Sequence, residues 1–319
     1  MKRRTFLENS AKASLAGLFL TNSWNAPSPL FDRVCVNLFS LPKVLEKDFA
    51  SGLQMLSAMG YKEIEMYGPY TFSAEKQKAN WKALEPMVGF SGSGFFGKTM
   101  PEVKAILKDT GLKVPSLHTD LHTLSELMGP LADAANQLGA KYVVLPAIPD
   151  EERKNIDDYK RMAERFNKIG VEAKSKGVHF TYHNHGYGLT KMDGVLPLDI
   201  ILQQTDPSLV YLEMDLFWTT AGGADPIELL KANKGRYKLM HVKDMKKKVR
   251  FSGDGGNPKQ WTELWGEMTT AGDGVLDLKN ILKVAKENGL VHCIVEQDIV
   301  AQPEIALKKS YDYLASLNS

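Results

Sequence analysis

Residues 178–215 read VHFTYHNHGYGLTKMDGVLPLDIILQQTDPSLVYLEMD, and this stretch contains the pattern that decides the fold. A short strand-like run at 178–185 is followed by a segment of helical period at 196–205. A second strand-like run follows at 210–215. Strand–helix–strand alternation of this kind predicts parallel strands that are joined by a helical crossover.

The same unit recurs along the whole chain. Strand-like runs occupy 34–39, 63–67, 114–118, 142–146, 178–185, 210–215, 237–241 and 291–296. Segments of helical period occupy 47–59, 100–110, 123–138, 155–176, 196–205, 225–234, 277–288 and 303–317. Glycine, a common helix C-cap, ends most of these segments before the next strand. Eight strand–helix pairs is the number that closes a (β/α)8 barrel.

The alternative for such alternation is an open, doubly wound parallel sheet. The chain has no G-x-G-x-x-G after its first strand and no phosphate loop of the G-x-x-x-x-G-K-[ST] type, which favours the barrel. We therefore predict an α/β protein with a (β/α)8 TIM barrel at 30–319. The barrel forms a single catalytic domain, with a polar, glycine-rich insertion at about 68–97.

Charge and cysteine content exclude several classes of protein. The formal net charge is +2, and because residues 1–26 carry +3, the remainder carries −1. A near-neutral body argues against nucleic-acid binding, which needs a basic surface. Cys35 and Cys293 are the two cysteines of the chain. They are too few for a disulfide framework and lack zinc-finger spacing, so we expect two buried thiols. No apolar run is long enough to predict a membrane span.

Residues 1–28 predict an export signal. The start, MKRRTFL, is positively charged; an apolar stretch at 13–20 and a small, polar segment at 21–28 follow. The pair Arg3-Arg4 resembles a twin-arginine signal. We therefore expect a periplasmic protein. The alternative is a cytoplasmic protein with an amphipathic N-terminal helix.

Ionisable side chains stand at or just after the ends of five predicted strands. They are His118, His183, His185, Glu213, Asp215, His241, Lys243, Asp244, Glu296 and Asp298. Active sites of such barrels lie at the C-terminal ends of the strands, so we expect these side chains at one rim. Imidazoles and carboxylates that converge there need a cation to offset repulsion and desolvation. Mixed donors of this kind suit a transition-metal ion better than Ca²⁺.

Five motifs of the chain resemble those of the xylose isomerase-like barrels of the sugar phosphate isomerase/epimerase group. They are Tyr182-His-Asn-His185, Leu212-Glu-Met-Asp-Leu-Phe-Trp218, His241-Val-Lys-Asp244, Gly272-Asp-Gly274 and Val295-Glu-Gln-Asp298. The resemblance extends over nearly the whole chain after residue 30. The motifs are typical of the superfamily and do not identify a substrate.

The resemblance implies one divalent metal, Mn, Zn, Co, Fe or Mg, held by the last four strands. The matching positions are His183, Asp215, His241 and Glu296. Many relatives carry a glutamate on the fifth strand, where this chain has His183. His185 lies on the same face of that strand and is an alternative ligand.

For activity, the resemblance implies a sugar isomerase or epimerase that removes a proton beside a carbonyl, with Glu296 as base. Because the fifth strand lacks a second carboxylate, we expect His185 and Lys243 as the other catalytic groups. The alternative is a lyase or hydratase that acts on keto-sugars or keto-glycosides by the same enolate chemistry. An alternative of another class is a non-catalytic sugar-binding barrel.

We expect a small sugar as the binding partner and no nucleic acid. The predicted substrate contacts are His118, Trp218, Asp244 and Asp298. Relatives of this group are often dimers or tetramers, so the resemblance leaves a homo-oligomer open.

Overall fold

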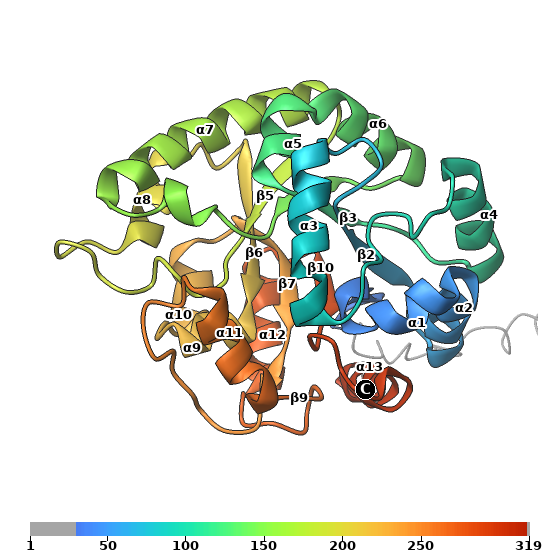
Figure 1. The fold of residues 1–319 in the computed structure, drawn as a ribbon. Helices are drawn as coiled ribbons and strands as arrows, with labels where there is room; N and C mark the ends of the chain where they lie inside the picture. The colour runs from blue at the N-terminus through green and yellow to red at the C-terminus, as the bar shows by residue number, and fades with distance from the viewer. Residues whose placement is uncertain (1–29, 318–319) are drawn as a thin grey trace, which may run out of the picture.

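The eight predicted strands form a closed barrel. The computed structural model describes residues 30–317, and here the strands are parallel in the order β1-β10-β7-β6-β5-β4-β3-β2 (Figure 1). Their bounds are Val34–Asn37 (β1), Glu63–Tyr67 (β2), Ser116–His118 (β3), Tyr142–Leu145 (β4), His179–His183 (β5), Val210–Asp215 (β6), Tyr237–Val242 (β7) and His292–Val295 (β10). The (β/α)8 TIM barrel expected from the sequence is confirmed.

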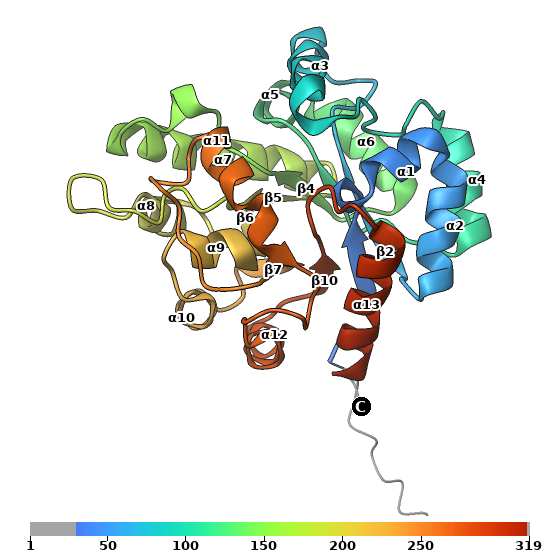
Figure 2. The same ribbon diagram turned by 60° about the horizontal axis from the view of Figure 1, so that its bottom comes forward.

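Helices surround the barrel (Figures 1 and 2). Their bounds are Pro42–Lys47 (α1), Phe49–Met59 (α2), Glu75–Val88 (α3), Met100–Thr110 (α4), Leu121–Glu126 (α5), Met128–Leu138 (α6), Ile156–Ser175 (α7), Pro197–Gln204 (α8), Leu216–Ala221 (α9), Pro226–Ala232 (α10), Pro258–Leu264 (α11), Leu278–Glu287 (α12) and Pro303–Ser316 (α13). A small antiparallel pair, Asp244–Met245 (β8) and Met268–Thr269 (β9), follows β7.

Two segments differ from the expected pattern. The predicted helix at 123–138 is broken at Leu127 into α5 and α6. Pro130 has no backbone N–H, so it fits the first turn of a new helix better than the interior of a long one. The insertion at 68–97 contains α3, of which only Val88 is buried. With no apolar stripe, this helix gave no periodic signal in the sequence.

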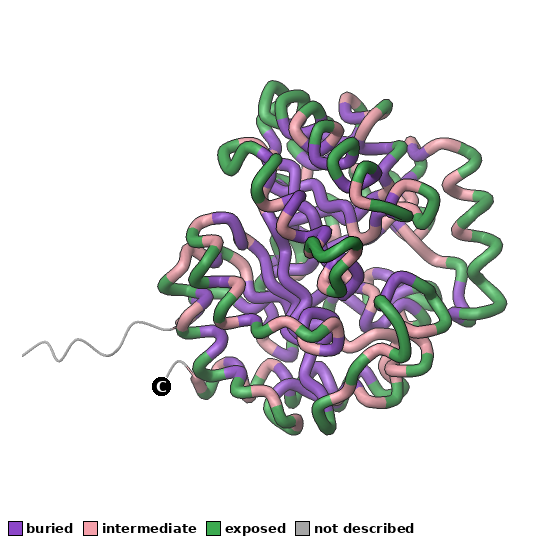
Figure 3. Tube along the Cα trace, turned by 90° about the vertical axis from the view of Figure 1, so that its left-hand side faces the viewer, coloured by how far each residue is buried: buried purple, intermediate pink, exposed green. Residues whose placement is uncertain are grey.

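The interior of the barrel changes from apolar to polar along the strands. Cys35, Tyr142, Val144, Leu239 and Ile294 pack into one cluster. Side chains alternate between faces of a strand, so His241 on β7 points to the same side as Leu239, two residues before it. Register pairs Asp215 with His241 and His183 with Glu213 on neighbouring strands. The apolar layer therefore lies below a layer of ionisable groups, and both are buried. Figure 3 shows the buried residues concentrated in the interior and the exposed ones along the outer segments.

Three further expectations concern the cysteines, the N-terminal export signal and the lack of a membrane span. Cys35 and Cys293 are free and buried, as expected. The predicted export signal at 1–28 lies outside the described residues. Within residues 30–317, none of the helices has the length and apolar character that a bilayer crossing requires.

The contact between α7 and the chain before β6 depends on the absence of a side chain at Gly170. A Cβ there would lie 2.6 Å from the carbonyl oxygen of Leu209 and 2.9 Å from its Cβ. We expect Gly170→Ala to lower the free energy of unfolding by about 1–3 kcal/mol through overpacking. We expect this loss although alanine is favoured over glycine within a helix by about 1 kcal/mol. Urea denaturation measures the change.

The control is Val171→Ala on the exposed side of the same helix, which should change the free energy of unfolding by no more than about 0.5 kcal/mol. Equal stability of the two variants would contradict the packing argument.

Candidate functional site

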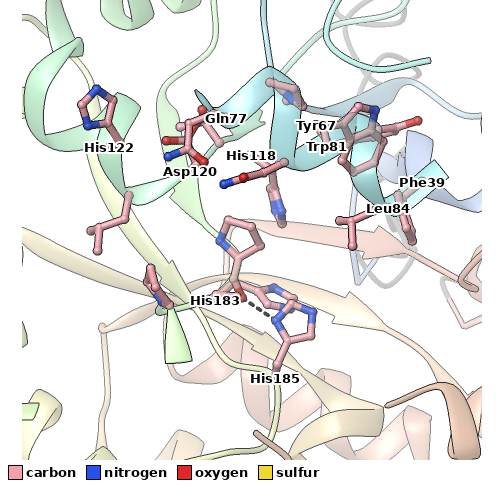
Figure 4. A pocket seen from close by; sticks show the side chains of 18 of the residues that line it. Phe39, Tyr67, Gln77, Trp81, Leu84, His118, Asp120, His122, His183 and His185 are labelled. Carbon is pink, nitrogen blue, oxygen red and sulfur yellow. Dashed lines mark hydrogen bonds between the residues drawn. The ribbon is translucent and has the colours of Figure 1, made fainter. Parts of the chain in front are cut away.

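A cleft of about 600 Å³ lies over the carboxyl ends of the strands. Its ionisable lining includes His118, His183, His185, His241, Lys243, Glu296 and Asp298. Figure 4 shows His183 and His185 on one side of the cleft and Tyr67, Trp81 and Leu84 on the other. The expected gathering of strand-end residues at one rim is therefore present.

Lys243 lies at the centre of the ionisable groups nearest the rim of the barrel. Its ammonium lies 3.0 Å from Asp215 Oδ2, 2.6 Å from Glu296 Oε2 and 2.9 Å from Asp298 Oδ1. Its side chain is 2% exposed, so these carboxylates offset a charge that water cannot reach. Burial would lower the pKa of Lys243, but the three carboxylates hold it well above its usual range.

The carboxyl groups around Lys243 differ in proton affinity. For Glu296, burial favours the neutral acid, but His241 and Lys243 hold its pKa well below the usual range. For Asp298, burial dominates over the attraction of Lys243 and raises the pKa to about 7. Two carboxyl groups of unlike proton affinity therefore share one ammonium, an arrangement that is typical of sites for proton transfer.

His241 connects the outer carboxylates with an inner set. Its Nδ1 lies 2.6 Å from Glu296 Oε2, and its Nε2 lies 2.6 Å from Glu65 Oε2. Burial would lower the pKa of His241, but Glu213, Glu296 and Glu65 raise it well above the usual value. His118 is held similarly, because burial is outweighed by Glu65 and Glu213, and its pKa rises to about 9.

The donors could hold a metal ion. Ligand atoms of Asp215, His241 and Glu296 lie within 4.8 Å of one another, and His183 Nε2 lies 3.8 Å from Asp215 Oδ2. Asp215 Oδ1 accepts from Trp218 N at 2.9 Å and so caps α9, whereas the buried Oδ2 has the ammonium of Lys243, 3.0 Å away, as its charged partner. Carboxylate oxygens and imidazole nitrogens that converge in a buried space are donors that suit a transition-metal ion.

A second group of possible donors lies deeper. One ligand atom each of His118, His183, Glu213 and His241 falls within 4.8 Å of the others. Of the four predicted ligands, the structure thus groups Asp215, His241 and Glu296, while His183 takes part in the inner group and reaches Asp215 from there.

The other predicted site residues form two groups, those that line the cleft and those that do not. His118, His185, Lys243 and Asp298 line the cleft. His185 binds the Pro146 carbonyl through Nδ1 and stacks on Trp261 at 5.1 Å between ring centroids. Burial, together with His183 and Lys243, holds the pKa of His185 well below its usual value, so the ring is neutral.

Trp218 and Asp244, also predicted as substrate contacts, are not among the residues that line the cleft. Trp218 is 1% exposed and stacks on Phe251 beneath the rim, where it supports Lys243 at 5.5 Å. Asp244 accepts backbone N–H groups of Gly272, Gly274 and Leu276 at 3.0–3.2 Å. Its carboxylate holds the turn after β9 and has no capacity left for a ligand.

Glu65 on β2 was not predicted. It is fully buried and accepts from Asn37, Ser116, His118 and His241. A signal was present in the sequence, because a short buried strand with glutamate at alternate positions, Glu63-Ile-Glu65, must place two carboxylates inside the barrel.

A family model described as xylose isomerase-like TIM barrel matches residues 53–317 of the chain. An inosose dehydratase from Clostridium perfringens (strain 13 / Type A) is 33% identical over 280 residues, which cover 82% of this chain and 88% of the relative. The family resemblance seen in the motifs is thereby confirmed.

Two solved structures show the same fold. A sugar phosphate isomerase/epimerase from Parabacteroides distasonis has a TM-score of 0.70 at 23% identity, covering 93% of this chain and 97% of that one. An IolI protein with a bound zinc atom has a TM-score of 0.61 at 16% identity, covering 90% and 98%. At these identities, the likeness concerns the fold alone.

The main expectation of an isomerase or epimerase is wrong. The similar curated proteins are named dehydratases, and a dehydratase is a lyase. The residues of the rim left this open, because isomerases and lyases of this chemistry both begin with removal of a proton beside a carbonyl.

Lys243→Met should destabilise the metal-free protein strongly, because it leaves Asp215, Glu296 and Asp298 without their shared cation. We expect the free energy of unfolding at neutral pH to fall by about 3–5 kcal/mol, as for other broken buried ion pairs. Urea denaturation after chelation measures the loss.

The matched control is Lys308→Met, which breaks an exposed pair with Asp312. That change should cost no more than about 1 kcal/mol. A loss in the Lys243 variant as small as that of the control would show that the buried ammonium is not needed for charge balance.

Proposed function

Since this chain belongs to the xylose isomerase-like TIM barrel family, we propose that it is a divalent-metal-dependent lyase or hydratase acting on keto-sugars or keto-glycosides. One observation carries the proposal. In the cleft, the carboxylate of Glu296, whose pKa is held well below its usual range, lies 2.6 Å from the buried ammonium of Lys243, and β5 carries His183 where many relatives have a glutamate. Elimination needs one base and one proton donor, and the names of the curated relatives support this class.

The cation would be held by His183, Asp215, His241 and Glu296. The ion would be one of Mn²⁺, Zn²⁺, Co²⁺, Fe²⁺ or Mg²⁺; when bound, it would polarise the substrate carbonyl and stabilise the enolate. The mixed carboxylate and imidazole donors, whose ligand atoms converge at the rim, support this assignment.

Glu296 is the proposed base. His241 Nδ1 and Lys243 Nζ both lie 2.6 Å from Oε2, so a proton from the substrate would be taken at Oε1. The carbon that loses the proton lies next to the carbonyl. The electron pair of the broken C–H bond forms the C=C bond of the product, and the C–O bond on the next carbon breaks with its pair.

Lys243 is the proposed proton donor to the departing oxygen, which leaves as water or as an alcohol. The surrounding carboxylates keep its amine protonated until then. His185 donates its Nδ1–H to Pro146, so its Nε2 is the acceptor and can hold a substrate hydroxyl. The same groups acting in reverse would add water to the unsaturated product.

Glu296→Gln should reduce turnover by at least about 100-fold, because general-base catalysis contributes factors of this size. The assay incubates the metal-loaded protein with keto-sugars and 3-keto-glycosides, and NMR detects the unsaturated ketone and the released water or alcohol. Glu228→Gln, on the exposed side of α10, is the control and should retain full turnover.

No elimination or hydration product from a broad panel would contradict the proposal. Sugar binding without turnover, unchanged in Glu296→Gln, would instead support a non-catalytic sugar-binding barrel, for which the missing carboxylate of β5 is the favouring observation.

Removal of the metal should abolish turnover. We expect activity to disappear after dialysis against a chelator and to return with one of the five ions, at one equivalent per chain. Circular dichroism before and after dialysis checks that the fold persists. Full activity in a preparation that elemental analysis finds free of metal would exclude a cation from the reaction.

A further inference from the structure

We propose that two buried glutamates beneath the rim, Glu65 and Glu213, are positioning residues that fix the tautomers of His241 and His183. Each glutamate would accept the N–H of one ring and thereby leave the other ring nitrogen directed at the cation site. The inference rests on the cation of the proposed function and concerns how this chain prepares its ligands.

His241 stands between the two layers of the site. Its Nε2 lies 2.6 Å from Glu65 Oε2, on the inner side. Its Nδ1 is the nitrogen near the rim, 2.6 Å from Glu296 Oε2 and 4.0 Å from Asp215 Oδ2. An Nε2–H donated to Glu65 therefore leaves the Nδ1 lone pair among the carboxylates that would share the ion.

The two ring nitrogens of His183 also face the two layers of the site, but here Nδ1 is the inner nitrogen and Nε2 the outer one. Its Nδ1 lies 2.9 Å from Glu213 Oε2 in the inner layer, and its Nε2 lies 3.8 Å from Asp215 Oδ2. An Nδ1–H donated to Glu213 leaves Nε2 free towards Asp215. Carboxylates that accept the second N–H of a ligand histidine fix its tautomer and orientation and raise its basicity.

The two glutamates are themselves held in place. Both side chains are 0% exposed. Glu65 accepts from Asn37 Nδ2 at 2.8 Å and Ser116 Oγ at 2.5 Å. His118 Nε2 lies 3.1 Å from Glu65 Oε2 and 2.8 Å from Glu213 Oε2, so it joins the two carboxylates. A carboxylate anchored from β1 and β3 can impose an orientation on a histidine of β7.

The chain supplies a matched control two residues away on the same strand. Glu63 is also buried and also accepts from a histidine, His292 Nδ1, at 2.7 Å. That histidine starts β10, at the end of the strand opposite the rim residue Glu296. Glu63→Gln therefore removes an equivalent carboxylate–imidazole contact without touching a proposed ligand.

The first experiment titrates the full-length protein with Zn²⁺ against a competing chelator. We expect zinc to bind about 10- to 100-fold more weakly to Glu65→Gln and to Glu213→Gln than to the wild type, the usual effect of removing such a partner. Glu63→Gln should stay within about threefold of the wild type. Equal zinc affinity of Glu65→Gln and Glu63→Gln would overturn the inference.

The second experiment needs no variant and so stands even if a substituted protein fails to fold. Long-range ¹H–¹⁵N NMR of the zinc-loaded wild type should show His241 protonated at Nε2 and His183 protonated at Nδ1. The opposite tautomer at either ring would overturn its assignment.

Neither experiment uses a sugar. Absence of lyase turnover in a protein that gives both expected results would count against the proposed reaction alone. A wild type that binds no zinc would overturn this inference together with the proposed cation.

Discussion

Compensation of buried charge is the constraint on which the carboxyl end of this barrel depends. In the metal-free protein, Lys243, His118 and His241 bear positive charge among carboxylates that water does not reach, and these carboxylates stand on or after other strands. An unpaired charge in such surroundings is very costly, so the contacts are stable only as a set. Registers of β2, β3, β6, β7 and β10 must all be correct at once for the charges to meet.

Most of the fold was predictable because hydrophobic period and helix-ending glycines are local signals. Every barrel strand lies where its run predicted it, within a few residues. The break at Leu127 and the helix α3 were not predicted, for two physical reasons. Pro130 lies in the first turn of a new helix inside a continuous apolar period, and α3 buries so little that its sequence looks like a polar loop.

The gathering of side chains at one rim was predictable where an ionisable residue stands at or just after the end of a strand, as for His183, His241, Lys243 and Glu296. Trp218 and Asp244 lie away from the cleft because residues just past a strand turn with the loop, and alternation no longer determines where they point. Asp244 is engaged by backbone amides of a turn about 30 residues later, which no local pattern reveals. Glu65 was missed because it stands in the middle of its strand, although its carboxylate reaches the same centre. The choice between isomerase and lyase depends on where electrons go after proton removal, and residue types do not encode that.

Because α3 buries so little of its surface, its packing affects how the sequence of this protein can diverge during evolution. The helix borders the cleft through Gln77, Trp81 and Leu84, yet only Val88 of its residues is buried. Substitutions at its exposed positions can therefore alter the shape of the cleft at little cost in stability, whereas a substitution beneath that leaves a buried charge unpaired is costly. Divergence in ligand preference among descendants of this chain should concentrate in that one helix.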